Sequence, residues 1–371
     1  MGSIDFSLAT ANDDPDLRQL LRENPMQGEI SVSLEREPDL FRAGTIEGER
    51  HQTIVARDRA IGRPVGMASR SVYSGFLNGR ACPLGYLSQL RVDRLYRGRA
   101  GLLSQGYALM RSVRTGHDLP FDLTTIVTDN HPARRVLGAG LSGIPSYQEL
   151  EPFTTLMLPL WRHQKTRPSR EFAIERGSRE RIEDIAACLE RNRARYQFAP
   201  RWTAGELLSP ERSRGLAPRD FLIAVHRGAV IGCIALWDQS SFKQIVVHNY
   251  GTTMRRWRSI VEISARLFGT PRLPAPGRPI PHVYLSHVAV DDDNVEVFSA
   301  LLARAYNDAR ERRQACLIAG FADRHPFLQI IQRSHHAWKY SSIIYAVCWE
   351  GGKAAVEGID RRVPHLEVGL L

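Results

Sequence analysis

The chain contains little lysine and no long apolar segment. Lysine occurs at only four positions, so nearly all of the positive charge comes from arginine, and the net charge at pH 7 is +10. A helix that crosses a bilayer needs about 18 or more consecutive apolar residues, and the sequence has no such run. The N-terminal residues also lack the basic and then apolar pattern of a signal peptide. We therefore expect a cytoplasmic protein without a membrane partner.

Cysteine is also scarce. The five cysteines are odd in number and widely spaced, and most of them lie within apolar runs: Cys82, Cys188, Cys233, Cys316 and Cys348. A disulfide framework or a cysteine metal site would show an even number of cysteines or short, regular spacings. The histidines at 325, 335 and 336 form no metal-binding pair with a carboxylate. We expect reduced cysteines in the core and no metal site.

The arginine-rich composition favours anionic partners, because a guanidinium group binds phosphates and carboxylates through two parallel hydrogen bonds. The basic residues are scattered rather than arranged in a stripe, and no known nucleic-acid-binding motif occurs, which disfavours nucleic acid. The length of 371 residues predicts two or three domains, each able to bury its own core.

The segment Gly85–Gly106 carries the clearest local signal. Its first part has the pattern of a short strand, and its second part has apolar residues at helical spacing, at positions 102, 103, 107 and 110. Between the two lies a small and basic loop, Arg97–Gly101. The first amides of a helix have no intrahelical partner and lie at the positive end of the helix dipole. The loop therefore predicts an anion site, where glycine lets a phosphate approach the backbone.

These residues resemble a known motif. The run LRVDRLYRGRAGLL resembles motif A of the GCN5-related N-acetyltransferases, which holds the pyrophosphate of acetyl-CoA with the pattern Q/R-x-x-G-x-G/A. Arg97 matches the first position, whereas Ala100 and Leu102 stand where the family has glycine. Leu102 must therefore either point inward or crowd the phosphate. A second match supports the first, because Asn130 and Ala133 resemble the N-x-x-A motif that follows the family's next strand.

The resemblance implies an α/β (α+β) fold, in which a mixed, mostly antiparallel sheet is flanked by helices. It also implies an acyl-CoA co-substrate, acetyl-CoA in the first place, whose pantetheine pairs with the strand and whose pyrophosphate lies in the loop. The positions that it assigns to the cofactor are Leu90, Arg91, Val92, Arg97, Gly98, Arg99, Ala100, Gly101, Leu102, Asn130 and Ala133.

Acyl transfer to an amine needs a base for the ammonium group and an acid for the leaving thiolate. In the resembling family a tyrosine commonly supplies the acid four residues after N-x-x-A, but this position is leucine here. Tyr147 is the substitute that we predict, with Tyr86 and Tyr107 as further options. For the base, the candidates are Glu29 and Ser88, acting through a chain of water molecules.

The order of expected elements repeats after a basic linker at 161–170. We therefore predict two tandem domains of the resembling fold, 1–160 and 171–371, an arrangement also seen in families such as mycothiol synthase and N-myristoyltransferase. In the second domain three carboxylates, Asp291–Asp293, take the place of the phosphate loop and would repel a diphosphate. We predict that this domain does not bind CoA in the usual way.

The second domain also contains an insertion, 251–281, with a helix expected over 254–267 and a proline-rich arm after it. Such a semi-rigid arm could cover the acceptor cleft of the first domain, form a contact in a homodimer or cover an edge strand.

Three functions remain open on the sequence alone. The leading hypothesis is an acyl-CoA-dependent N-acyltransferase that acts on a small-molecule or peptide amine. A second is an acyltransferase that uses an acyl carrier protein, which fits the basic charge and the altered glycine loop. A third is a non-catalytic protein in which two transferase domains serve as a ligand sensor or scaffold. The sequence does not identify the acceptor, because loops build acceptor walls.

Overall fold

The computed structural model describes residues 3–26, 30–99, 101–166, 168–252 and 274–371. Three features expected from the sequence lie outside these residues, namely Glu29, Ala100 and the helix over 254–267. All five cysteines are free, and four of them are buried. No helix in the described ranges is long and apolar enough to cross a membrane.

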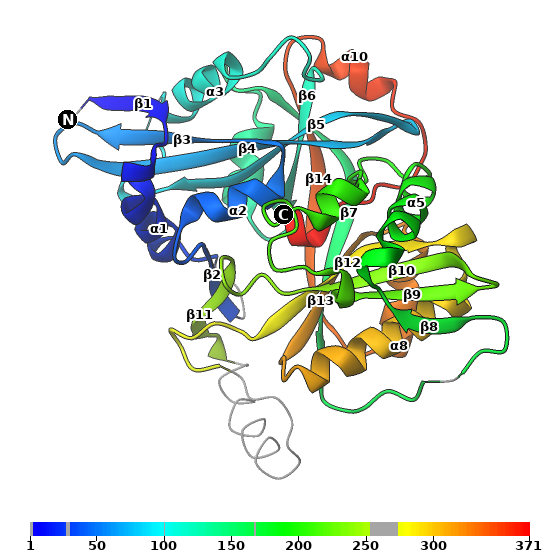
Figure 1. The fold of residues 1–371 in the computed structure, drawn as a ribbon. Coiled ribbons are helices and arrows are strands. Elements are labelled where there is room, and N and C mark those ends of the chain that lie inside the picture. The colour runs from blue at the N-terminus through cyan, green and yellow to red at the C-terminus, as the bar shows by residue number, and fades with distance from the viewer. Residues whose placement is uncertain (1–2, 27–29, 100, 167, 253–273) are drawn as a thin grey trace.

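One sheet of twelve strands runs through the molecule (Figure 1). The first half of the chain provides β1 (Ile4–Leu8), β3 (Arg50–Asp58), β4 (Arg63–Leu77), β5 (Arg80–Val92), β6 (Phe121–Val127) and β7 (Ser146–Pro159). The second half provides β8 (Ala173–Arg176), β9 (Phe221–His226), β10 (Ala229–Trp237), β12 (His282–Val290), β13 (Cys316–Ala322) and β14 (Trp338–Cys348). The order across the sheet is β1-β3-β4-β5-β6-β14-β7-β13-β12-β10-β9-β8.

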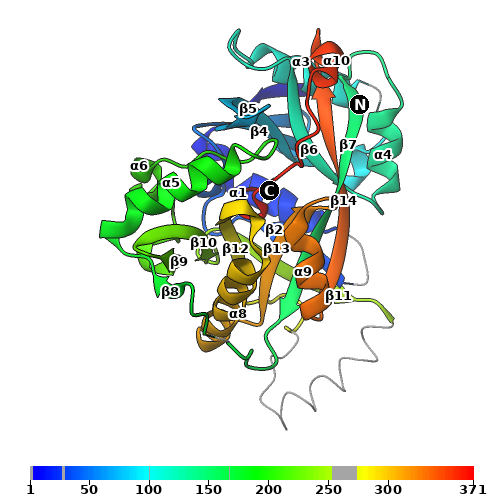
Figure 2. The same ribbon diagram turned by 90° about the vertical axis from the view of Figure 1, so that its right-hand side faces the viewer.

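The two halves exchange strands at the centre of this sheet. β14 comes from the end of the chain, yet it pairs with β6 on one side and β7 on the other, and β7 also pairs with β13. Figure 2 shows β7 and β14 side by side, extending from one half of the molecule into the other. The two sheets are therefore continuous, and the boundaries at 160 and 171 stay a prediction.

The composition of the sheet matches the fold class that the motifs implied. β5 pairs with β6 and β12 pairs with β13 in parallel, whereas the other pairs in the sheet are antiparallel. The prediction of a mixed, mostly antiparallel sheet flanked by helices is confirmed. The end of the first half forms a single long strand, β7, because it pairs with β14 along its first part and with β13 along its second.

Helices cover both faces of the first half. α3 (Leu102–Ser112) and α4 (His131–Gly138) lie on one face, here called the α3 face, where Ile54 of β3 packs with Tyr107 and Met110. α1 (Asp14–Glu23) and α2 (Leu40–Glu47) lie on the opposite α1 face, where Val55 and Met67 pack with leucines of α1. Because side chains of a strand alternate between faces, neighbouring residues of β3 serve the two cores.

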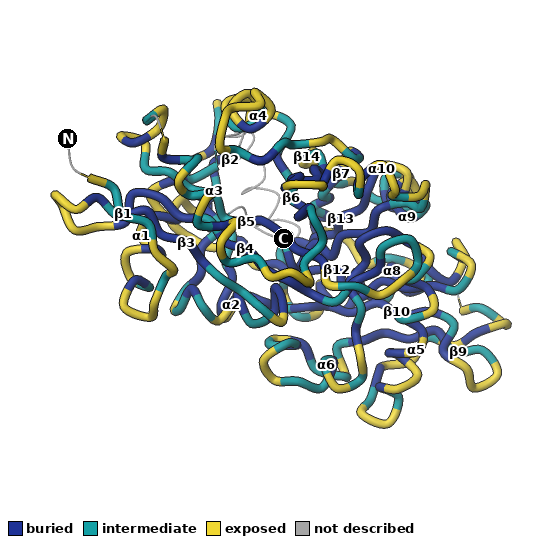
Figure 3. Tube along the Cα trace, turned by 90° about the horizontal axis from the view of Figure 1, so that it is seen from above, coloured by how far each residue is buried: buried dark blue, intermediate teal, exposed yellow. Residues whose placement is uncertain are grey.

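The second half repeats this layering. α5 (Ile182–Arg193) packs on one face of β9, β10 and β12, and α8 (Val295–Glu311) packs on the other. Two further helices in this half are short, α6 (Ala204–Leu208) and α10 (Gly352–Glu357). A third, α9 (Pro326–Ser334), packs beside β13. The last residues, 366–371, pack in the middle of the molecule, and Figure 3 shows that end among buried segments.

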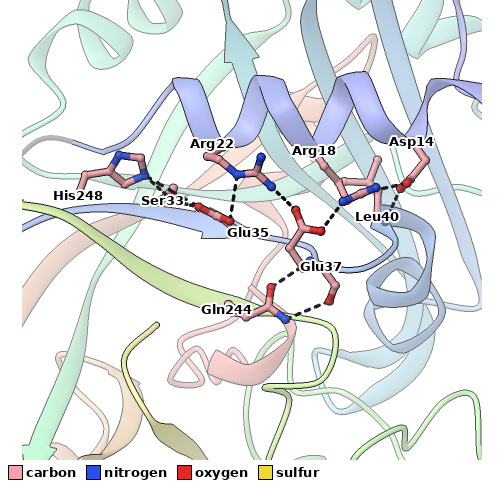
Figure 4. Close-up of polar contacts among 9 residues, drawn as sticks. All are labelled: Asp14, Arg18, Arg22, Ser33, Glu35, Glu37, Leu40, Gln244 and His248. Carbon is pink, nitrogen blue, oxygen red and sulfur yellow. Dashed lines mark hydrogen bonds and ion pairs between the residues drawn. The ribbon is translucent and has the colours of Figure 1, made fainter. Parts of the chain in front are cut away.

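A small second sheet joins the halves beside α1. β2 (Ile30–Glu35) pairs with β11 (Gln244–Tyr250), and neither strand was expected as part of such a pair. Figure 4 shows how α1 is fastened to it: Arg18 and Arg22 contact Glu37, and the Gln244 amide exchanges two hydrogen bonds with the Glu37 backbone at 2.9 and 3.0 Å. The second half of the chain therefore contributes a strand, β11, to the structure beside α1.

Asp122 fixes the junction of β5 and β6. Its buried carboxylate accepts hydrogen bonds from Arg70 at 2.8 and 3.1 Å, from the Trp349 indole at 2.8 Å and from Arg114. A Cβ on the neighbouring Gly85 would lie 1.7 Å from an oxygen of this carboxylate. Only glycine therefore fits at this position of β5.

We expect Gly85→Ala to destabilise the protein by roughly 3–5 kcal/mol, because the methyl group would displace a buried, paired carboxylate. Denaturant unfolding measures this loss. Gly116→Ala is the matched control, since a Cβ on Gly116 would meet no atom within 4 Å. Equal stability of the two variants would show that the junction tolerates displacement of Asp122.

Candidate functional site

β5 and β6 part shortly after they meet. They pair only at Gly85 with Asp122 and at Tyr86 with Leu123. The last contacts across the gap are a 2.7 Å hydrogen bond between the hydroxyls of Tyr86 and Thr125 and a 2.8 Å bond from Thr124 to the Leu87 carbonyl. Beyond this point, here called the first fork, β5 remains paired with β4 on its other side.

A bulge lies at the first fork. The register between β4 and β5 shifts next to Ser88, and Gln89 has a positive φ of 55°. The Ser88 hydroxyl and the Gln89 side-chain oxygen are buried and have no hydrogen-bond partner among the described residues. Buried polar atoms are nearly always satisfied, so these two point to a ligand or water at the fork.

The loop after β5 is packed against the protein on its inner side and carries arginine side chains on its outer side. Tyr96 is buried and donates a 2.7 Å hydrogen bond to Asp58, and Leu102 packs with it in a small core cluster. The hydrogen bond from Tyr96 is the main reason that the pKa of Asp58 is lowered. Leu102 thus points inward, which resolves the alternative that the motif left open. Any contact from Leu102 to a phosphate would have to come from its backbone.

The upper side of the loop presents guanidinium groups and a glycine. Arg97 donates to the Val92 carbonyl at 3.2 Å and to Asn24 at 3.0 Å, and the Arg99 guanidinium lies 3.9 Å from the centre of the Tyr96 ring. Gly98 has a φ of 80°, and a Cβ there would meet nothing within 4 Å. The loop is therefore held in place while its outer surface stays open.

Most other positions assigned to the cofactor border the first fork. Leu90 and Val92 follow the bulge on β5, and burial lowers the pKa of Arg91 between them. The Leu90 carbonyl accepts a hydrogen bond from its neighbour Arg91 at 2.9 Å. Asn130 caps α4 by accepting a hydrogen bond from the Ala133 amide at 3.3 Å. The N-termini of α3 and α4 thus follow the two strands that form the fork.

Tyr147 lies on the α3 face, beneath α3. Its hydroxyl hydrogen-bonds that of Tyr107, and burial raises the pKa of both phenols, that of Tyr107 to about 12. Tyr86, the other option, faces the opposite side and has its hydroxyl at the fork itself, where burial raises its pKa. The role of Tyr147 as acid stays a prediction, and Tyr86 is the tyrosine whose hydroxyl bridges the two parting strands.

A second fork repeats the first one in the other half. β12 and β13 pair from His282 to Tyr284 and then part, and His287 has a positive φ of 51° next to the register shift between β10 and β12. Its amide is occupied, because it donates to the Glu367 carboxylate at 3.0 Å, and Arg193 pairs with the same oxygen at 2.7 Å. The chain thus places a carboxylate on the bulge amide of its own second fork.

The acidic turn after β12 is also engaged. Asp291 pairs with Arg191 at 2.8 Å, and Asp293 accepts hydrogen bonds from Arg195 and from the Tyr196 hydroxyl, the latter at 2.6 Å. These partners belong to α5 and to the residues that follow it. An occupied bulge amide and a closed acidic turn give a physical reason for the prediction that this half does not bind CoA in the usual way.

Two features of the site were not predicted from the sequence. The bulge at Gln89 has no sequence signal, because a positive φ at glutamine depends on the strands around it. The second feature is a group of buried polar side chains on the α1 face, Thr53, Ser69 and Ser71. Their signal is visible, since Ser69 and Ser71 stand at alternate positions in MASRSVY and therefore share one face of the strand.

No family model matches the chain, and no curated protein matches it by sequence. Its fold is similar to the crystal structure of Saccharomyces cerevisiae N-myristoyltransferase with bound myristoyl-CoA, with 11% identity and a TM-score of 0.61 over 94% of this chain and 79% of that one. A structure of the same yeast enzyme with myristoyl-CoA and inhibitors gives 12% identity and a TM-score of 0.62 over 94% and 80%.

A third similar structure is a GCN5-related glucosamine N-acetyltransferase region of a fungal multi-domain GH3 β-N-acetylglucosaminidase. It has 15% identity and a TM-score of 0.60 over 93% of this chain and 38% of that one. At these identities the similarity shows the fold alone. The chain therefore has the fold of the GCN5-related N-acetyltransferase superfamily, as the two motifs predicted, and its tandem arrangement is consistent with that of N-myristoyltransferase.

We expect Glu367→Gln to destabilise the protein by roughly 3–5 kcal/mol, because it leaves the Arg193 guanidinium buried without its counter-charge. Glu190→Gln is the matched control: its partner Arg201 lies at 2.9 Å in a pair that is about 40% exposed, and such pairs contribute about 0–1 kcal/mol. Urea unfolding of both variants checks this. A loss below 1 kcal/mol for Glu367→Gln would mean that the second fork does not depend on its carboxylate.

Proposed function

We propose that this chain is an N-acyltransferase that moves an acyl group from acyl-CoA to an amine, and that the first fork is its donor site. The observation that carries the proposal is the combination of a strand that loses its neighbour with a fixed basic loop at the open end. An extended ligand with amide groups can pair with the free edge of a strand, as an added strand does. A diphosphate can bind the amides and guanidinium groups of the loop.

The residues fit an acyl-CoA molecule in two places. The pantetheine arm would pair along Leu90 and Val92 of β5, and the pyrophosphate would lie over Arg97 and Gly98. Gly98 supports this assignment because its positive φ and open surroundings let a phosphate reach the backbone. Leu102 does not hinder it, since its side chain is buried below the loop.

The bulge offers an anion site for the reaction. In the second fork a carboxylate oxygen lies 3.0 Å from the amide of His287, which has nearly the same φ as Gln89. By this internal comparison the Gln89 amide would donate to the thioester oxygen, where negative charge develops during acyl transfer. A preorganised donor of this kind typically contributes a factor of about 10² to 10³ to the rate.

The donor and acceptor are narrower proposals. We take acetyl-CoA as the first donor because the loop resembles that of acetyltransferases, while the yeast structures contain myristoyl-CoA, so chain length must be compared directly. The acceptor is an amine of a small molecule or a peptide. With the second fork occupied by Glu367, the chain would carry one donor site rather than two.

Calorimetric titration with acetyl-CoA and with myristoyl-CoA tests the donor site. We expect Gly98→Glu to weaken binding at least about tenfold, equivalent to 1.4 kcal/mol, because it places a carboxylate where the pyrophosphate would lie. Gly62→Glu is the matched control, since Gly62 also has a positive φ, of 69°, and open surroundings, but lies in the turn between β3 and β4.

Release of free thiol in the presence of spermidine, glucosamine or a glycine-starting peptide tests transfer. Thiol release that depends on the amine supports the enzyme. Tight acyl-CoA binding without release by any amine would favour a ligand-binding protein, and equal binding by the Gly98 and Gly62 variants would place the donor elsewhere. If an acyl carrier protein binds and acyl-CoA does not, the donor is a carrier-bound acyl group.

A further inference from the structure

The α1 face of β3 and β4 carries polar side chains where a buried sheet usually carries apolar ones. Thr53, Ser69 and Ser71 are each no more than 4% exposed, and His51 lies beside them. Their side chains share one face because Thr53 is paired with Ser69, and His51 with Ser71, across the two antiparallel strands. Burying four polar groups is costly unless they bond to one another or to a ligand.

These groups form a connected chain of hydrogen bonds. The Thr53 and Ser69 hydroxyls lie 2.8 Å apart, and the Thr53 hydroxyl lies 3.4 Å from Nε2 of His51. The other ring nitrogen, Nδ1, lies 2.8 Å from the Ser71 hydroxyl. Hydroxyl groups both donate and accept, so a proton can pass along such a chain.

One end of the chain reaches the first fork. Ser69 is the paired partner of Ser88 across β4 and β5, and side chains of paired residues lie about 5 Å apart on one face. The Ser88 hydroxyl is one of the two buried polar atoms at the fork without a partner in the described residues. The polar chain therefore points toward the place where a thioester would lie.

The other end meets a buried carboxylate. Oε2 of Glu47, at the end of α2, lies 3.6 Å from Nδ1 of His51 and has no hydrogen-bond partner among the described residues. Gly44, also in α2, makes room for the ring, because a Cβ there would lie 2.6 Å from it. The negative charge of this carboxylate on the Nδ1 side favours a proton on Nδ1, which leaves Nε2 to accept one from Thr53.

Three charged groups face His51. Glu47 raises the pKa of the imidazole, whereas burial, which is the largest effect, and the cations Arg36 and Lys243 lower it. Arg36 lies 3.2 Å and Lys243 3.7 Å from the Glu47 carboxylate. Because the pKa of His51 is lowered from 6.5, the ring is neutral at pH 7 and can take a proton.

We propose that His51, beside Glu47, is the end of a proton relay that starts at the first fork next to Ser88, runs through Ser69 and Thr53, and takes the proton of the acceptor. This inference rests on the proposed N-acyltransferase function. The ammonium group of the acceptor gives one proton to the relay, and the free amine attacks the thioester carbonyl. The bond between carbon and sulfur breaks, and the second amine proton goes to the thiolate, leaving an amide and CoA. His51 and Glu47 position and receive the proton without touching the substrate.

The relay is tested with the full chain and the most active amine of the panel, by following kcat, KM and the pH profile of kcat/KM. We expect Thr53→Val to lower kcat by roughly 10²-fold, because it interrupts proton transfer, while the Kd for acetyl-CoA stays unchanged. Thr154→Val is the matched control, because Thr154 is also a buried strand threonine, with a 2.8 Å bond to Asp323. It should keep the kcat of the wild type.

Variants of His51 and Glu47 report on the titration of the imidazole, and a variant of His248 is the control. His51→Gln should remove the acidic limb of the profile, whereas His248→Gln, which loses a 2.8 Å bond to Ser33 on β2, should keep it. Glu47→Gln should move the limb to lower pH, because the pKa of His51 falls when the carboxylate is lost.

The outcomes separate the relay from the proposed function. A wild-type kcat and an unchanged acidic limb in Thr53→Val and His51→Gln would overturn the relay while the transferase stands. Absence of acyl-CoA binding or thiol release in the wild type would remove both. Loss of kcat together with loss of acetyl-CoA binding in Thr53→Val would also overturn the relay, because it would show a structural role.

Discussion

The packing of Gly85 against Asp122 is the constraint on which the site depends. A buried carboxylate that accepts four hydrogen bonds from three residues fills the space that a side chain at position 85 of β5 would need, so this position of the junction requires glycine. They separate two residues later, and the backbone beyond that point has a free edge. The anchored loop after β5 then places guanidinium groups at the open end. A local steric requirement thus decides where an extended anionic ligand can enter the sheet.

The two forks of the chain share one backbone geometry but differ in whether their polar groups have partners. Gln89 and His287 both sit at bulges with a positive φ. In the second fork, Glu367 satisfies the amide, and Arg193 neutralises the carboxylate. In the first fork, the polar atoms of Ser88 and Gln89 remain without partners among the described residues. The filled fork stabilises the interior, whereas the open one keeps unsatisfied groups at a cost in stability, as functional sites commonly do.

A polar interior lies where the two halves meet. β14 and β7 tie the two sheets into one, and Glu47 of α2 lies here beside Leu366 and Glu367 and 3.7 Å from Lys243. Glu47 balances Arg36 and Lys243 in this interior, and burial lowers the pKa of Lys243 to about 7. A buried pair is weak evidence for stability because desolvation offsets the attraction. These charges also act on the neighbouring His51, whose pKa Glu47 raises and the two cations lower.

The sequence by itself determined the local elements of the first half, the two motifs and the class of fold, because strand and helix periodicity and a loop of glycine and arginine are local properties. It also indicated that Leu102 must turn inward or obstruct the loop. Tertiary structure alone decided the position of β14 between β6 and β7, the pairing of β2 with β11 and the chain from Ser69 to His51. These contacts join residues that are distant in sequence, and their energy depends on packing and burial that no local pattern records. The bulge at Gln89 belongs to the same class, since neighbouring strands and not the residue impose its conformation.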